Sequence, residues 1–70
     1  MQPHQQRVVE EKTELDEKIM KLGEFVMQRF GVFDKLHIAE RIRLMRQLSI
    51  MQLYSQVLEE RIAAFEVSHD

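Results

Sequence analysis

The second half of this 70-residue chain is apolar around more of a helix than one partner helix can cover. At the helical step of roughly 100° per residue, one stripe of apolar positions comprises Leu44, Leu48, Met51, Leu58, Ile62 and Phe65. A second stripe, on the other side of Arg43, comprises Ile50, Leu53 and Val57. A helix of the same chain can bury the first stripe. The second needs another molecule, so the pattern predicts a protein that associates.

The few helix-breaking residues divide the chain into two helices. Apolar residues repeat at helical spacing through the first half, at Val8, Leu15, Ile19, Leu22 and Val26. Gly31 is placed to end this helix, and Asp34 is placed to cap the next one. We therefore predict a helix over about 5–30, a turn at 31–34 and a second helix over about 35–66.

A short link between two long helices favours an antiparallel hairpin. In that arrangement residues whose numbers sum to about 66 lie opposite each other, which pairs apolar with apolar side chains along the seam. Four residues, Phe25, Phe30, Phe33 and Leu36, are expected to pack together at the turn. The predicted fold class is all-α: residues 1–70 form one domain, an antiparallel two-helix hairpin that self-associates into a helical bundle.

The first helix also carries surplus apolar surface. A single chain of this size buries only about 60% of its unfolded surface, and the sequence contains no cysteine for a disulfide. Association is the stabiliser that remains. We predict a homo-oligomer of unspecified subunit number, whose interface comprises Ile50, Leu53, Val57, Val9, Met20 and Met27.

The chain lacks the side-chain patterns of catalysis. His4, His37 and His69 stand far apart, and neither a His-Glu-x-x-His run nor a glycine-rich phosphate loop is present. No serine has a histidine base at helical spacing. The acidic segment 10–14 lacks the Glu-x-x-His pair of helical-bundle metal sites and is interpreted as a solvated face. We therefore expect a protein that is not an enzyme and has neither metal nor cofactor.

Charge and hydropathy argue against two further classes. The 12 acidic and 10 basic residues give a formal net charge of −2, which does not provide the basic field of a bulk nucleic-acid binder. No apolar run approaches the roughly 18 residues of a membrane span. The expected location is the cytoplasm.

The polar positions between the two stripes of the second helix form one line, which comprises Arg43, Gln47, Tyr54 and Arg61. Arg7 and Lys12 flank the seam on the first helix. Two interpretations of these residues remain open. In one, they form a ladder of interhelical contacts, such as an Arg61–Glu11 ion pair with Tyr54 beside it. In the other, two hairpins meet to form a pocket, where the cationic side chains hold an anion and Tyr54 stacks on a base.

Two segments carry a resemblance to a known family. Residues 4–22 contain R-V-V-x-E-K-x-E-L-D-x-K-I, and residues 47–65 contain Q-L-x-x-M-x-x-Y-x-x-x-L-x-x-R-I. These patterns resemble a family of short phage and prophage proteins first catalogued in crAss-like phages. The resemblance implies a small helical fold and a phage origin, and hence the cytoplasm of an infected bacterial host. It implies no activity.

The chain is also similar, in size and helical character, to phage anti-defence sponges, which sequester cyclic-nucleotide signals of host immunity. This analogy implies an oligomeric protein that binds a cyclic oligonucleotide between subunits, through Arg43, Gln47, Tyr54 and Arg61, with Lys12 or Arg7 from the first helix. The alternative is a protein-interaction module that docks a host or phage protein and has no small ligand.

Overall fold

The fold, seen in a computed structural model that describes residues 1–67 and side chains through Phe65, is all-helical. The described residues form three helices, α1 (Pro3–Met27), α2 (Val32–Lys35) and α3 (Ile38–Val67). The predicted all-α class is confirmed, but two helices were expected and a short third one lies in the connection. The predicted domain also included residues 68–70, which lie outside the described residues.

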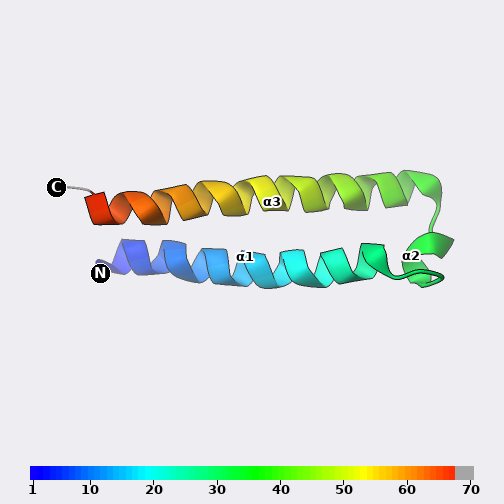
Figure 1. The fold of residues 1–70 in the computed structure, drawn as a ribbon, viewed down its shortest axis with the longest axis horizontal. Helices are drawn as coiled ribbons and strands as arrows, with labels where there is room; N and C mark the ends of the chain where they lie inside the picture. Colours follow the sequence, from blue (N-terminus) through cyan, green and yellow to red (C-terminus); the bar gives the residue numbers. More distant parts are fainter. Residues whose placement is uncertain (68–70) are drawn as a thin grey trace.

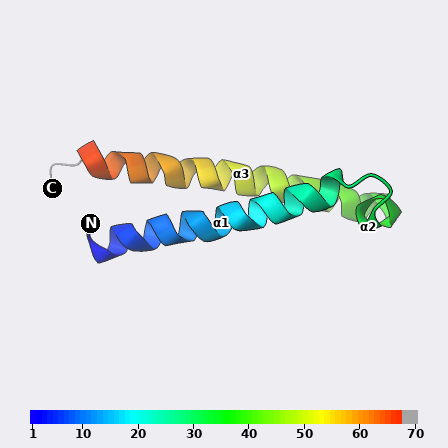
Figure 2. The same ribbon diagram turned by 60° about the horizontal axis from the view of Figure 1, so that its bottom comes forward.

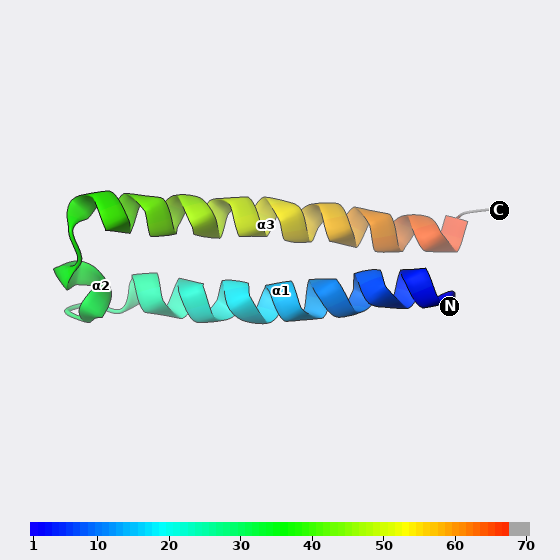
Figure 3. The same ribbon diagram turned by 180° about the vertical axis from the view of Figure 1, so that it is seen from behind.

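The two long helices lie side by side and run in opposite directions. Figures 1 and 3 show the start of α1 and the end of α3 at one end of a rod and α2 at the other, and the rod measures 51 × 15 × 15 Å. Figure 2 shows that the two helix axes are inclined to each other. Within the described part of the chain, no helix is long and apolar enough to cross a membrane.

The end of α1 differs from the prediction. Pro3 begins the helix, and the Gln5 side chain accepts a hydrogen bond of 2.9 Å from the backbone N–H of Gln2. The helix ends at Met27, three residues earlier than expected. Gly31 does not cap it, because the residue with a positive φ is Phe30 (φ 59°).

The start of the second long helix is also later than predicted. Asp34 lies inside α2, and its carboxylate accepts a hydrogen bond of 2.7 Å from the backbone N–H of Phe30. The N-terminus of α3 is capped instead by His37, whose Nδ1 accepts a hydrogen bond of 3.1 Å from the N–H of Ala39. The proposed cap at Asp34 was therefore wrong, since this carboxylate closes the turn before α2.

Three side-chain hydrogen bonds join the long helices: Tyr54 to Glu11, Lys12 to Ser55, and Ser55 to Asp16. In the first two, the paired residue numbers sum to 65 and 67, which agrees with the predicted value of about 66. The third joins residues whose numbers sum to 71, about one helical turn away from that register. Every residue of the first predicted stripe is buried or half-buried, and Leu58 is 0% exposed.

The aromatic cluster at the turn forms without one of its expected members. Phe25 of α1 and Phe33 of α2 pack edge to face with ring centroids 6.0 Å apart, and Leu36 is half-buried beside α2. Phe30 is 89% exposed. Its left-handed backbone conformation is part of a tight turn on the outside of the rod, where the ring finds no packing partner.

Candidate ligand-binding site

The predicted polar line lies on one exposed side of α3. Arg43, Gln47, Tyr54 and Arg61 are all exposed to solvent. The Tyr54 hydroxyl donates a hydrogen bond to the Glu11 carboxylate on α1. That bond raises the pKa of Tyr54 above its usual 10.0, since the carboxylate stabilises the protonated phenol. The bond fixes the ring of Tyr54 at the border between the two helices.

Arg43 and Gln47 form contacts within α3, and no hydrogen bond or ion pair of Arg61 is recorded among the described side chains. Arg43 Nε lies 2.8 Å from Glu40 Oε1, one helical turn away, and Gln47 Nε2 lies 3.8 Å from Met51 Sδ. The charge of Arg61 acts to lower the pKa of Tyr54, against the larger effect of the bond to Glu11. Among the described side chains, no ion pair joins Arg61 to Glu11. Glu11 thus pairs with Tyr54 and not with Arg61, the partner that the ladder interpretation gave it.

Lys12 belongs to a different cluster, inside the helix–helix seam. Its Nζ lies 2.6 Å from Asp16 Oδ2 and 3.3 Å from Ser55 Oγ, and the Ser55 hydroxyl donates to the other Asp16 oxygen. The hydrogen bond with Asp16 raises the pKa of Lys12. Hydrogen bonds from Lys12 and Ser55 lower the pKa of Asp16. The charge of Lys12 is therefore neutralised within the seam and is not directed to the line on α3.

Asp16 and Ser55 are polar partners that the sequence reasoning missed. A signal for Ser55 was present, because residues 44, 48, 51, 55, 58, 62 and 65 repeat at spacings of four and three and only position 55 is polar. Asp16 follows Lys12 by one helical turn, at a spacing at which a lysine and a carboxylate interact.

Arg7 is exposed near the start of α1, and the structure does not bring it together with the line on α3 by any recorded bond. In the part of the chain that the structure describes, no pocket is present. Apart from Lys12, the predicted site residues therefore lie on open surface, and a ligand could be enclosed only if a second surface covered them.

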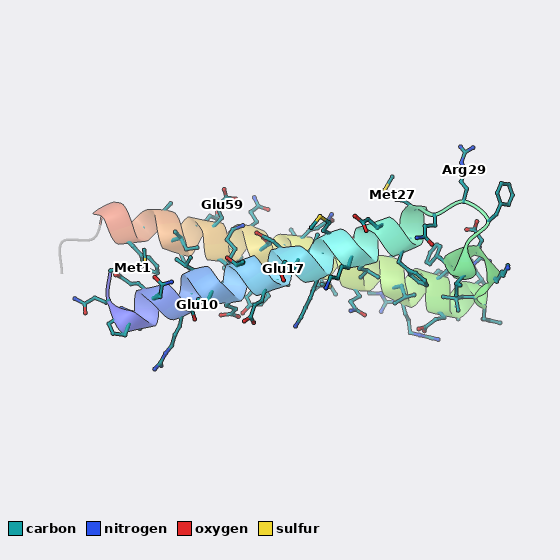
Figure 4. All side chains as sticks on the ribbon, turned by 90° about the horizontal axis from the view of Figure 1, so that it is seen from below. Met1, Glu10, Glu17, Met27, Arg29 and Glu59 are labelled. Carbon is teal, nitrogen blue, oxygen red and sulfur yellow. The ribbon has the colours of Figure 1, made fainter. Side chains whose placement is uncertain are left out.

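The predicted interface residues are largely exposed in the single chain. Ile50, Leu53, Val57, Met20 and Met27 are exposed, and Val9 is half-buried. Figure 4 shows the Met27 side chain extending from the end of α1. Three further apolar residues of α3, Ile38, Ile42 and Met45, are 53–55% exposed and were not predicted. They extend the exposed apolar surface towards the N-terminus of α3.

The fold and this surface define a class: short all-helical proteins whose outer faces carry exposed apolar and polar side chains. A family model described as Sequestin matches residues 2–64, so the chain belongs to the Sequestin family. The family name denotes sequestration, which is binding rather than catalysis. No curated protein and no solved structure matches the chain. The relation to crAss-like phages is not part of this match and stays a prediction.

Proposed function

We propose that this protein is a non-enzymatic, phage-encoded oligomer that sequesters a small anionic nucleotide signal, a cyclic oligonucleotide, and so blunts host antiphage defence. One observation carries the proposal. Two arginines and a tyrosine, Arg43, Arg61 and Tyr54, lie in a line on α3, exposed beside apolar surface that a second chain can cover. The family name, which denotes sequestration, supports the same role.

The chemistry of these side chains suits a nucleotide. A guanidinium binds phosphate through two parallel hydrogen bonds, and an aromatic ring stacks on a base. The bond from Tyr54 to Glu11 uses the hydroxyl, and Tyr54 as a whole is 43% exposed, so part of the side chain is accessible for stacking. The proposed role is binding without turnover, in which the bound signal is removed by mass action alone.

The proposal is tested by calorimetric titration of the purified oligomer with cyclic dinucleotides and cyclic trinucleotides, at one fixed salt concentration because phosphate contacts are screened by salt. We expect at least one cyclic oligonucleotide to bind. Arg61→Ala should abolish binding while leaving the helix content and the oligomeric state unchanged. Arg29→Ala, at an exposed arginine in the loop after α1, is the matched control and should bind as the parent does.

Two results would contradict the proposal. If no cyclic oligonucleotide binds or raises the melting temperature, the protein is not a nucleotide sponge. If Arg61→Ala unfolds the protein, the line is a structural ladder rather than a site.

The second candidate function is a protein-interaction module without a small ligand. The exposed apolar residues of α3 favour it, since apolar surface of this extent marks protein contacts. In that case a host or phage protein should co-purify with the chain in stoichiometric amount, and Arg61→Ala should leave the complex intact.

A further inference from the structure

One face of α3 carries a pattern that is symmetric about its own centre. Arg46, Ile50, Leu53, Val57 and Glu60 follow one another at spacings of four, three, four and three. This is the spacing of residues that face a partner helix. The three apolar members are 49–63% exposed. Leu53 stands in the middle, with an apolar residue on each side and a charged residue at each end.

The charges at the two ends are opposite. Arg46 and Glu60 each lie seven residues from Leu53, in opposite directions, and both are exposed. Among the side chains described through Phe65, neither takes part in an ion pair. The face is therefore complementary to itself when it is reversed, which is the condition for a two-fold contact between identical chains.

We propose that this face joins two copies of the chain, with their α3 helices antiparallel and Leu53 of both copies at the two-fold axis. Ile50 then packs beside Val57 of the partner subunit. Arg46 lies opposite Glu60 of the partner subunit, and the axis repeats this pair at the other end. A parallel pairing would instead place Arg46 beside Arg46 of the partner subunit. Like charges in contact select against that orientation.

Helix geometry leaves room for this partner. The face centred on Leu53 lies roughly 150° around α3 from the seam residues that contact α1, as measured by the helical step. Figure 1 shows α1 on one side of α3 only. Two copies therefore form a four-helix layer in the order α1, α3, α3, α1. Around each α3, the directions to α1 and to the partner's α3 are separated by roughly 150° on one side and by roughly 210° on the other. The four-helix layer is therefore concave on the side of the smaller angle.

The polar line of α3 lies on that concave side. Arg43, Tyr54 and Arg61 fall about midway between the seam and the proposed contact, at roughly 75° from each. A two-fold axis perpendicular to both α3 helices keeps both copies of the line on the same side. Tyr54 of both copies lies next to the axis, and Arg61 of each copy lies near Arg43 of the partner subunit.

The two copies of the polar line, which the two-fold axis brings together, are called the doubled line. Its role as a ligand site rests on the proposed function, whereas the pairing itself does not. The doubled line has two tyrosines at its centre and an arginine pair on each side. Such a site fits one nucleotide with two phosphate groups per two chains.

Cysteine cross-linking tests the pairing, since the native chain has no cysteine. Leu53→Cys should form a disulfide-linked dimer under mild oxidation. Ile50→Cys alone should not, because antiparallel pairing offsets the two copies of this position by about 9 Å along the helices, beyond the reach of a disulfide. The double variant Ile50→Cys/Val57→Cys should cross-link. Cross-linking of Ile50→Cys alone, or none with Leu53→Cys, would overturn the proposal.

Charge reversal gives an independent measurement, by analytical ultracentrifugation at low salt. Arg46→Glu and Glu60→Arg should each weaken the dimer by roughly tenfold, because the two-fold axis converts two attractions into two repulsions. The double variant Arg46→Glu/Glu60→Arg should restore parental affinity. Arg29→Glu, at an exposed arginine in the loop after α1 and outside the pattern, is the control. A parental chain that stays monomeric at micromolar concentration, or a double variant as weak as the singles, would refute the pairing.

Titration of the dimer with a cyclic dinucleotide tests the doubled ligand site separately from the pairing of the chains. One nucleotide per two chains, with a cyclic mononucleotide bound at least tenfold more weakly, supports the doubled site. One nucleotide per chain overturns the doubled site and leaves the proposed function standing. A cross-linked dimer that binds no nucleotide overturns the proposed function and leaves the pairing standing.

Discussion

The Tyr54 hydroxyl on α3 donates a hydrogen bond to the Glu11 carboxylate on α1. This bond joins the two long helices on the side that carries the exposed arginines. It orients the aromatic ring without using its faces, and it forms with both residues exposed to solvent. The same contact therefore contributes to the register of the fold and holds the ring that the proposed ligand would stack on.

The first prediction concerns the ionisation of Tyr54, which is the only tyrosine of the chain. Its pKa is raised above 10.0 by the bond to Glu11. The phenolate absorbance at about 295 nm should therefore have its midpoint above pH 10, and Glu11→Gln should lower the midpoint. The contribution of this bond to stability is present below pH 10 and is lost as the pH rises through the raised pKa. Glu14→Gln is the control and should leave the midpoint unchanged.

The second prediction concerns acid stability. Hydrogen bonds from Lys12 and Ser55 lower the pKa of Asp16 below 3.8. The group therefore contributes stability above that value, and the contribution is lost as the pH falls through the lowered pKa. Asp16→Asn should reduce the free energy of unfolding at pH 7 and leave it nearly unchanged at pH 2. Urea titrations at the two pH values check this. An equal loss at both would show that the carboxylate charge is not what stabilises the fold, and Glu17→Gln serves as the control.

The seam of this fold could be predicted from the sequence, whereas the connection could not. The positions of Leu44, Leu58 and their stripe follow directly from the helical period, and the register follows from pairing apolar with apolar. The turn depends on single backbone angles. Gly31 was the natural candidate for a left-handed residue, but Phe30 takes that conformation. The backbone N–H of Phe30 donates a hydrogen bond to the carboxylate of Asp34 in α2, and this bond stabilises the turn.

The candidate site shows a similar division. Periodicity placed Tyr54 and Arg61 on one line, and the structure keeps both exposed. Periodicity did not show that Lys12 would be neutralised, because the contact with Asp16 and Ser55 depends on how long side chains bend within the seam.

The third prediction concerns Leu58, whose side chain is completely buried. It has 0% exposure, and in the observed register it lies opposite the first turns of α1. Leu58→Ala should lower the free energy of unfolding by about 2–5 kcal/mol, as lost burial and a residual cavity add. Chemical denaturation at a fixed chain concentration measures the change. Gln52→Ala, on the exposed side of α3, should change it by less than about 0.5 kcal/mol. A loss below 1 kcal/mol at Leu58 would mean that α1 and α3 do not pack through this residue.

The last prediction uses the backbone of the turn. Phe30 has φ 59°, in the left-handed region that disfavours residues with a Cβ, and its ring is 89% exposed. Phe30→Gly should therefore raise the free energy of unfolding by about 0.5–1 kcal/mol, because the relief of strain exceeds the entropy that glycine loses on folding. The bond from the N–H of residue 30 to Asp34 is a backbone bond and is retained. Phe30→Ala removes the same ring but keeps the Cβ, so it should leave stability nearly unchanged. If alanine stabilised the chain as much as glycine, the gain would come from removing an exposed ring rather than from the backbone conformation of the turn.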